Sequence, residues 1–142
     1  MNPNSYLGAS NPQEREMIGI NIQSPWSRLL INKDKVVETR SYPLPEKYKN
    51  QELALIETPG KYGLFKSRII GKITFSHSFK YESKNQWLDD YDNHLVDKSD
   101  EDYGWKYDKP KYGWVVSNII KFNSPVDPPK KRGIIFASGC LV

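Results

Sequence analysis

The stretch that most constrains the fold is residues 24–45, SPWSRLLINKDKVVETRSYPLP. Serine at the N-cap followed by proline at the first helical position favours a helix start, so Ser24 and Pro25 predict one short helix over 26–32. Residues 36–40 (VVETR) are rich in β-branched side chains and predict a strand. The two prolines that follow end this strand, because proline has no N–H to donate to a ladder.

Hydrophobic patterns typical of strands occur on both sides of this stretch. Apolar residues alternate over 18–22, from 69 to about 81, and over 114–122. Residues 53–58 (LALIET) are almost continuously apolar, as expected of a central strand, and 133–136 predict a last strand. The pattern therefore gives five or six short strands.

Few helices separate these strands. A capping-box pattern over 83–86 predicts a second short helix, 62–67 is compatible with a helical turn, and the acidic stretch 97–102 predicts a loop. A doubly wound parallel sheet needs a crossover helix for each strand pair, which this chain lacks. The predicted fold class is α+β: a small mixed or antiparallel β-barrel of five to six strands with two or three short helices, closed so that its edges are hidden.

The length of 142 residues indicates one folded domain. Aromatic residues make up 13% of the chain, too many for a disordered protein, although only 37% of it is hydrophobic. Residues 1–16 are rich in Asn, Pro and Ser and show no period, so we predict a flexible N-terminal arm there and the domain over 17–142.

Composition excludes several functions. The single cysteine rules out an internal disulfide, two isolated histidines predict no metal site, and no phosphate-loop or dinucleotide motif predicts a cofactor. No apolar run is long enough for a membrane span and no signal pattern opens the chain, so we expect a soluble, cytoplasmic protein. The sequence does not predict its oligomeric state. The net charge of +4 permits a nucleic-acid partner without requiring one.

The predicted strand at 36–40 carries the best candidate chemistry. Glu38 and Arg40 project from the same face of this strand, and Lys35 lies just before its start. Lysine can engage a phosphate or act as a base, arginine can bind two acceptors, and glutamate can accept from an exocyclic amine. A polar pocket and a surface ladder of ion pairs are both compatible with this pattern.

Aromatic and basic residues alternate over 103–114, where Tyr-Gly-Trp occurs twice with three lysines between. Aromatic rings stack on bases and flanking lysines hold the phosphate backbone, so this segment is a candidate for single-stranded nucleic acid. The alternative is that the rings fill the core. We expect Trp114, on an alternating strand, to be buried and Trp105, in a polar loop, to be exposed.

Three of these motifs occur in the order typical of one family: Pro25-Trp26, then Lys35-x-x-Glu38-x-Arg40, then Tyr112-Gly113-Trp114. In this order they resemble the signature of the ASCH family of PUA-like β-barrels, and the resemblance covers about residues 17–138. One departure is Lys33, which stands where the family usually has glycine.

The resemblance implies binding of RNA, single-stranded nucleic acid or a modified nucleoside. Together with the aromatic segment it gives these candidate binding residues: Trp26, Lys33, Lys35, Glu38, Arg40, Tyr42, Trp105, Tyr112 and Trp114.

Two other functions stay open. One branch of the family hydrolyses N4-acetylcytidine with a lysine, a threonine three residues later and a glutamate, and a ribonuclease activity is also associated with the family. Here the threonine position is Glu38, so in an enzyme Lys35 and Glu38 would be the catalytic residues. The third hypothesis is a protein-interaction domain that docks its partner through the aromatic segment 103–114.

Overall fold

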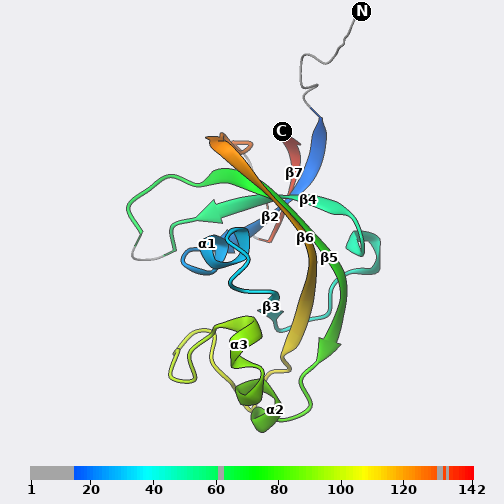
Figure 1. Cartoon of the computed structure of the whole chain (residues 1–142), viewed down its shortest axis with the longest axis vertical. Coiled ribbons are helices and arrows are strands. Elements are labelled where there is room, and N and C mark those ends of the chain that lie inside the picture. The colour runs from blue at the N-terminus through cyan, green and yellow to red at the C-terminus, as the bar shows by residue number, and fades with distance from the viewer. Residues whose placement is uncertain (1–14, 61–62, 131–132, 134) are drawn as a thin grey trace, which may run out of the picture.

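The computed structural model describes residues 15–60, 63–130, 133 and 135–142, and Figure 1 shows them as a curved sheet with short helices. The strands are β2 (Glu16–Gln23), β3 (Val37–Arg40), β4 (Glu52–Thr58), β5 (Arg68–Lys80), β6 (Tyr112–Val126) and β7 (Phe136–Leu141). The α-helices are α1 (Trp26–Ile31), α2 (Lys84–Asp89) and α3 (Tyr91–His94), and Glu46–Tyr48 form a 3-10 turn. No helix in this part of the chain is both long and apolar enough to cross a membrane.

The six strands form one mixed sheet in the order β3-β6-β5-β4-β2-β7. Neighbouring strands are antiparallel except β2 and β4, which run parallel. The long pair β5 and β6 curves from one end of the molecule to the other (Figure 1). The fold class is therefore α+β with a mixed sheet, as predicted.

The predicted closure into a barrel is wrong. In the described part of the chain, the edge strands β3 and β7 pair with β6 and β2 respectively and not with each other. Strand β3 has only four residues and pairs with the first four residues of β6, at the end of the sheet farther from β7 (Figure 1). The two edges are thus too short and too far apart along the sheet to meet.

Most predicted elements are present within a few residues of their expected bounds. The last strand is displaced, since β7 begins at Phe136 where the predicted strand ends. Residues 63–67 are not helical, and 61–62 lie outside the described residues. Residues 1–14 of the predicted arm also lie outside them, whereas Glu16 already begins β2.

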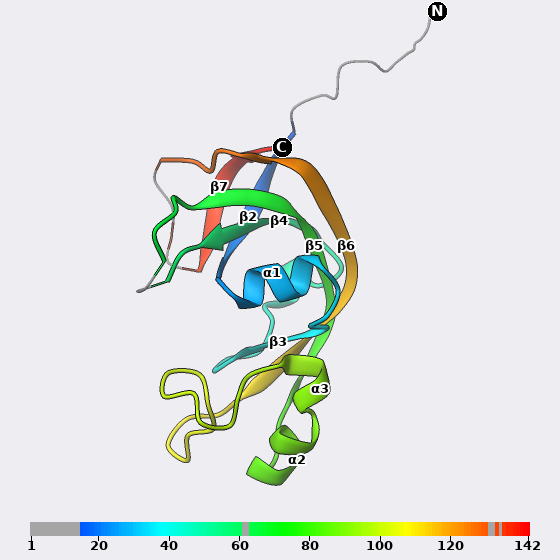
Figure 2. The same ribbon diagram turned by 60° about the vertical axis from the view of Figure 1, so that its left-hand side comes forward.

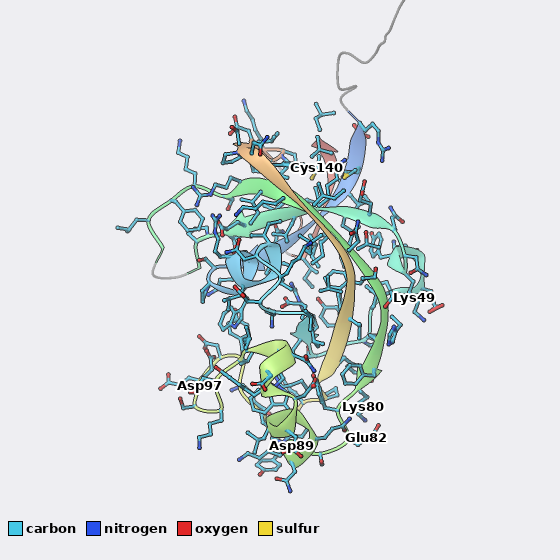
Figure 3. All side chains as sticks on the ribbon, viewed as in Figure 1. Lys49, Lys80, Glu82, Asp89, Asp97 and Cys140 are labelled. Atoms are coloured by element: carbon cyan, nitrogen blue, oxygen red, sulfur yellow. The ribbon has the colours of Figure 1, made fainter. Side chains whose placement is uncertain are left out.

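Helix α1 fills the concave face of the sheet (Figure 2). Its Leu30 and Ile31 are buried in the main core with apolar side chains of β2, β4, β5 and β6. A second cluster lies where β2 and β7 approach closely, at the end marked by Cys140 in Figure 3. Gly19 permits this approach, because a Cβ atom there would lie 2.7 Å from the Cys140 sulfur.

A buried carboxylate fastens α1 to the sheet. Glu57, on β4, accepts hydrogen bonds from the Ser27 hydroxyl at 2.7 Å and the Arg28 guanidinium at 2.8 Å. Arg68, on β5, donates to it through two nitrogens at 2.9 and 3.0 Å. Burial alone would raise the pKa of Glu57, but the bonds from Ser27 and Arg68 and the charge of Arg28 lower the pKa below its ordinary value. This cluster fixes where Trp26 sits at the start of α1.

Candidate functional site

A cavity of about 650 Å³ lies where β2, β3, the start of α1 and the loop after α3 meet. Its walls come from segments far apart in the sequence: Asn21, Ile22, Gln23, Trp26, Glu38, Thr39, Arg40, Thr58, Ser67, Val96, Tyr103, Lys130, Gly133 and Ile135. Small-molecule sites measure about 300–1,000 Å³, so the cavity has the size of a ligand site.

Glu38 and Arg40 form one polar wall of this cavity. Their side chains leave the same face of β3, as the period-2 pattern predicts. Arg40 Nε donates to Glu38 Oε2 at 3.0 Å, and Arg40 Nη2 lies 2.9 Å from the same oxygen. Nη2 also donates to the Asn21 carbonyl at 3.1 Å. Burial opposes the charge of Arg40, but the Glu38 carboxylate and the Tyr42 phenol outweigh it and raise the Arg40 pKa. Arg40 is thus charged, and the two side chains hold each other rigidly.

Lys35 lies behind this wall rather than in it. Its side chain is 1% exposed, its ammonium donates to the His94 carbonyl, and Nζ lies 3.6 Å from Glu38 Oε1. Burial lowers the pKa of Lys35 to about 8, although Glu38 opposes the shift. The structure therefore brings together Lys35, Glu38 and Arg40, with only the last two facing the cavity.

His94 is a structural neighbour of Lys35 that the sequence did not indicate. Its ring is buried, stacks on Trp87 at 4.7 Å between centroids, and pairs with the Trp87 carbonyl through Nε2 at 2.7 Å. Nδ1 accepts from the Val96 N–H at 3.0 Å, which assigns the proton to Nε2. Burial lowers the pKa of His94, and the positive charge of Lys35 adds to the effect. The ring is neutral near pH 7 and positions the carbonyl that receives Lys35.

Two aromatic rings also line the cavity. Trp26 meets Tyr103 edge to face, with ring centroids 4.9 Å apart. The Tyr103 hydroxyl donates to Gln23 Oε1 at 2.8 Å, which ties the loop after α3 to the end of β2. Tyr103 belongs to the predicted aromatic segment. Its place beside Trp26 depends on its contact with Gln23, which lies 80 positions earlier in the sequence.

The other aromatic candidates belong to the core or its border. Trp114 is fully buried, as predicted, and its indole N–H donates to the Tyr42 carbonyl at 3.0 Å. Tyr42 and Tyr112 are partly buried against the main core. Trp105 is partly buried against the cluster beneath α2 and α3, so the prediction of an exposed ring there is wrong. A loop tryptophan is buried here because Trp87 offers a packing partner, with centroids 6.3 Å apart.

Lys33 lies outside the cavity and is exposed. Its φ of 68° is in the left-handed region, where glycine carries no Cβ penalty. The turn after α1 thus has a conformation that suits glycine, and Lys33 adopts it. In the described residues, no group of three His, Cys, Asp or Glu side chains could hold a metal ion.

The fold and the cavity together define an α+β domain whose mixed sheet curves around a polar, ligand-sized site. No family model matches the sequence, and no curated protein matches it. The structure is similar to the crystal structure of ASCH from Zymomonas mobilis, with a TM-score of 0.61 and 12% identity over 78% of this chain and 72% of that chain.

Two variants of the Zymomonas mobilis protein give the same result. One, with a tyrosine replaced by phenylalanine, has a TM-score of 0.61 and 12% identity over 80% of this chain and 76% of that chain. The other, with a serine replaced by alanine, has a TM-score of 0.60 and 10% identity over 85% of this chain and 86% of that chain. The chain therefore has an ASCH-like fold.

Proposed function

We propose that this protein is a PUA-like domain that binds single-stranded RNA or a modified nucleotide, with one base in the cavity between β3 and α1. The observation that carries the proposal is that a fixed ion pair and two aromatic rings line one ligand-sized space. A rigid carboxylate and guanidinium, Glu38 and Arg40, line it together with the rings of Trp26 and Tyr103.

This arrangement matches the chemistry of a nucleobase. Glutamate accepts from exocyclic amines, arginine donates to ring nitrogens and carbonyl oxygens, and aromatic side chains contact the base faces. Because Arg40 is itself held by Glu38 and the Asn21 carbonyl, the polar wall needs little reorganisation when a ligand enters. Lys130 adds a positive charge to the lining, which suits a phosphate-bearing ligand.

The test is a titration followed by ¹H–¹⁵N NMR with cytidine, N4-acetylcytidine and a short single-stranded RNA of mixed sequence. We expect the Trp26 indole signal and the β3 amides to shift. Arg40→Lys keeps the charge but loses the two-nitrogen geometry, so binding should weaken by about tenfold or more. Tyr103→Ala should also weaken binding. Because Tyr103 is 39% exposed, this variant tests the proposal even if Arg40→Lys lowers the stability of the fold.

Lys33→Gln is the matched control, because it removes a charge from an exposed residue outside the cavity lining. It should bind like the wild type. If no ligand shifts these signals, or if Arg40→Lys and Tyr103→Ala both bind like the wild type, the proposal is wrong.

A hydrolase is the second candidate, and the lowered pKa of Lys35 is the observation that favours it. Against it, the Lys35 ammonium is buried behind Glu38 and engaged by the His94 carbonyl. A substrate in the cavity would meet Glu38 first. We expect little or no release of cytidine from N4-acetylcytidine; rapid release that disappears in Lys35→Ala would replace the binding proposal with the enzymatic one.

A further inference from the structure

A second, smaller cavity of about 270 Å³ adjoins the first. The two share four lining residues: Thr39, Arg40, Tyr103 and Ile135. The second cavity extends from this common wall along Ser41 and Tyr42 to the loop segment 102–111. A ligand in the first cavity can therefore reach the second past Arg40 and Tyr103.

The two cavities differ in charge. Four cationic side chains line the second one, against the single carboxylate of Asp102: Arg40, Lys106, Lys109 and Lys111. Glu38, which lines the first cavity, does not line the second. An anionic group is thus disfavoured beside Glu38 and favoured one step further along the same groove.

Two of these lysines are positioned by neutral groups. The Lys106 ammonium donates to the Glu101 carbonyl at 2.6 Å, and that of Lys111 donates to the Tyr103 carbonyl at 2.8 Å. Lys111 also lies 5.3 Å from the centre of the Trp87 ring. A carbonyl or an aromatic face orients an ammonium but does not cancel its charge. Burial and the neighbouring Lys106 accordingly lower the pKa of Lys111, as expected where positive charge is in excess.

We propose that the second cavity binds a phosphate group of the ligand whose base occupies the first, so that the ligand is a nucleotide or an RNA strand and not a free nucleoside. This inference rests on the proposed function. Arg40 stands at the junction with its orientation fixed by Glu38, and lysines surround the space beyond it. Arginine and lysine clusters of this kind bind phosphate oxygens through charge-assisted hydrogen bonds.

The experiment compares affinities across a ligand series by calorimetry. The series contains each common nucleoside, its 3′- and 5′-monophosphates, inorganic phosphate, and a short RNA with either normal or uncharged methylphosphonate linkages. We expect a phosphate to raise affinity by about tenfold or more over the nucleoside. A gain with the monophosphates points to a terminal phosphate, and a gain with only the normal RNA points to a phosphodiester; both support the subsite.

Charge-removing variants locate the effect. Lys109→Gln and Lys106→Gln should each reduce the phosphate-dependent gain severalfold, lower the salt dependence of RNA binding, and leave nucleoside affinity unchanged. Lys49→Gln is the matched control, since Lys49 lines neither cavity. It lies on the other side of the molecule from Asp97, which belongs to the loop after α3 (Figure 3).

The outcomes separate this inference from the proposed function. Equal affinity for nucleosides and their monophosphates would overturn the phosphate subsite and leave base binding intact. Binding of inorganic phosphate that depends on Lys106 and Lys109, without binding of any nucleoside, nucleotide or RNA, would overturn the proposed function and support an anion site. If Lys49→Gln lowered RNA affinity as much as Lys109→Gln, the attraction would be diffuse and the subsite would be wrong.

Discussion

At the scale of single residues, Lys35 is an ammonium buried among groups that only partly compensate its charge. Glu38 stabilises the charge, while burial, Arg40 and Lys111 destabilise it, and the pKa falls to about 8. A lysine with a lowered folded-state pKa destabilises the fold wherever it is protonated. This cost is complete below about pH 8 and disappears as the pH rises from about 8 to the unfolded value near 10.5.

Lys35→Met should remove this pH dependence. Relative to the variant, the wild type should gain about 2 kcal/mol in free energy of unfolding between about pH 7.5 and pH 9.5. Urea denaturation at both pH values measures the change, and the comparison cancels other groups that titrate in the window. Lys33→Met, two residues away and exposed, should show no such difference. If the difference in free energy of unfolding between the wild type and Lys35→Met did not change with pH, the buried charge would be contradicted.

The sequence could predict part of this site. Glu38 and Arg40 share a strand face because alternate residues of a strand do, and the structure keeps that relation. Gln23 and Tyr103 could not be paired in advance, because their contact spans 80 residues and depends on how the loop after α3 folds back. The burial of Lys35 was also unpredictable, since its partner carbonyl belongs to His94.

At the scale of secondary-structure elements, α1 is held to the sheet by the Glu57 cluster. Ser27→Ala removes a buried donor to this carboxylate and should cost about 1–3 kcal/mol in free energy of unfolding near pH 7. Because Ser27 helps to keep the pKa of Glu57 low, this cost is present above pH 4.5 and should decrease as the pH falls through the lowered pKa.

Thermal or urea unfolding of Ser27→Ala at neutral and acidic pH tests the role of α1. Ser124→Ala, at an exposed position on β6, is the control and should leave stability nearly unchanged. Ligand affinity should also fall in Ser27→Ala, since Trp26 precedes Ser27 on the same helix and lines the cavity. Equal stability of the two serine variants would mean that the Ser27 hydrogen bond does not help to hold α1, and that Arg28 and apolar packing suffice.

The elements that the sequence predicted well are those with strong local signals. The Ser83 hydroxyl caps α2 as expected, accepting from the Gln86 N–H, and alternate residues of β2 face the main core as predicted. In β5 and β6 the predicted alternation breaks at register shifts between the two strands: Ile69 lies in the second cluster and Ile120 is exposed. Strand β7 was displaced because its sequence, FASGCL, has weak strand propensity and contains Gly139 at φ 76°. Its pairing with β2 depends on contacts such as Met17 with Cys140 that no local pattern encodes. The parallel pairing of β2 with β4 is likewise a long-range choice.

At the scale of the whole molecule, α2 and α3 lie at one end of the long strands β5 and β6, beyond the part of the sheet that curves around α1 (Figure 2). The loop after α3 joins this end to the cavity: Tyr103 contacts Gln23 and Trp26, and Val96 and Trp105 pack in the cluster that Trp26 also contacts. One hydrogen bond and one aromatic pair are together worth about 1–3 kcal/mol. A single substitution at Tyr103 removes both of these contacts and leaves the packing of Val96 and Trp105 in place.

Tyr103→Ala should consequently release the loop while leaving the core in place. We expect amide hydrogen exchange over 97–111 to accelerate by about fivefold or more, and exchange in the core strands β4 and β5 to stay at the wild-type rate. Tyr107→Ala, in the same loop but at a side chain 85% exposed, should not change the exchange rates. A nucleotide that fills both cavities should slow exchange of the loop in the wild type and much less in Tyr103→Ala. The loop also has turns of its own, in which the Gly104 N–H donates to the Asp100 carbonyl at 3.0 Å. Acceleration of equal size in the two tyrosine variants would show that such local contacts hold the loop and that the contacts of Tyr103 with Gln23 and Trp26 add nothing.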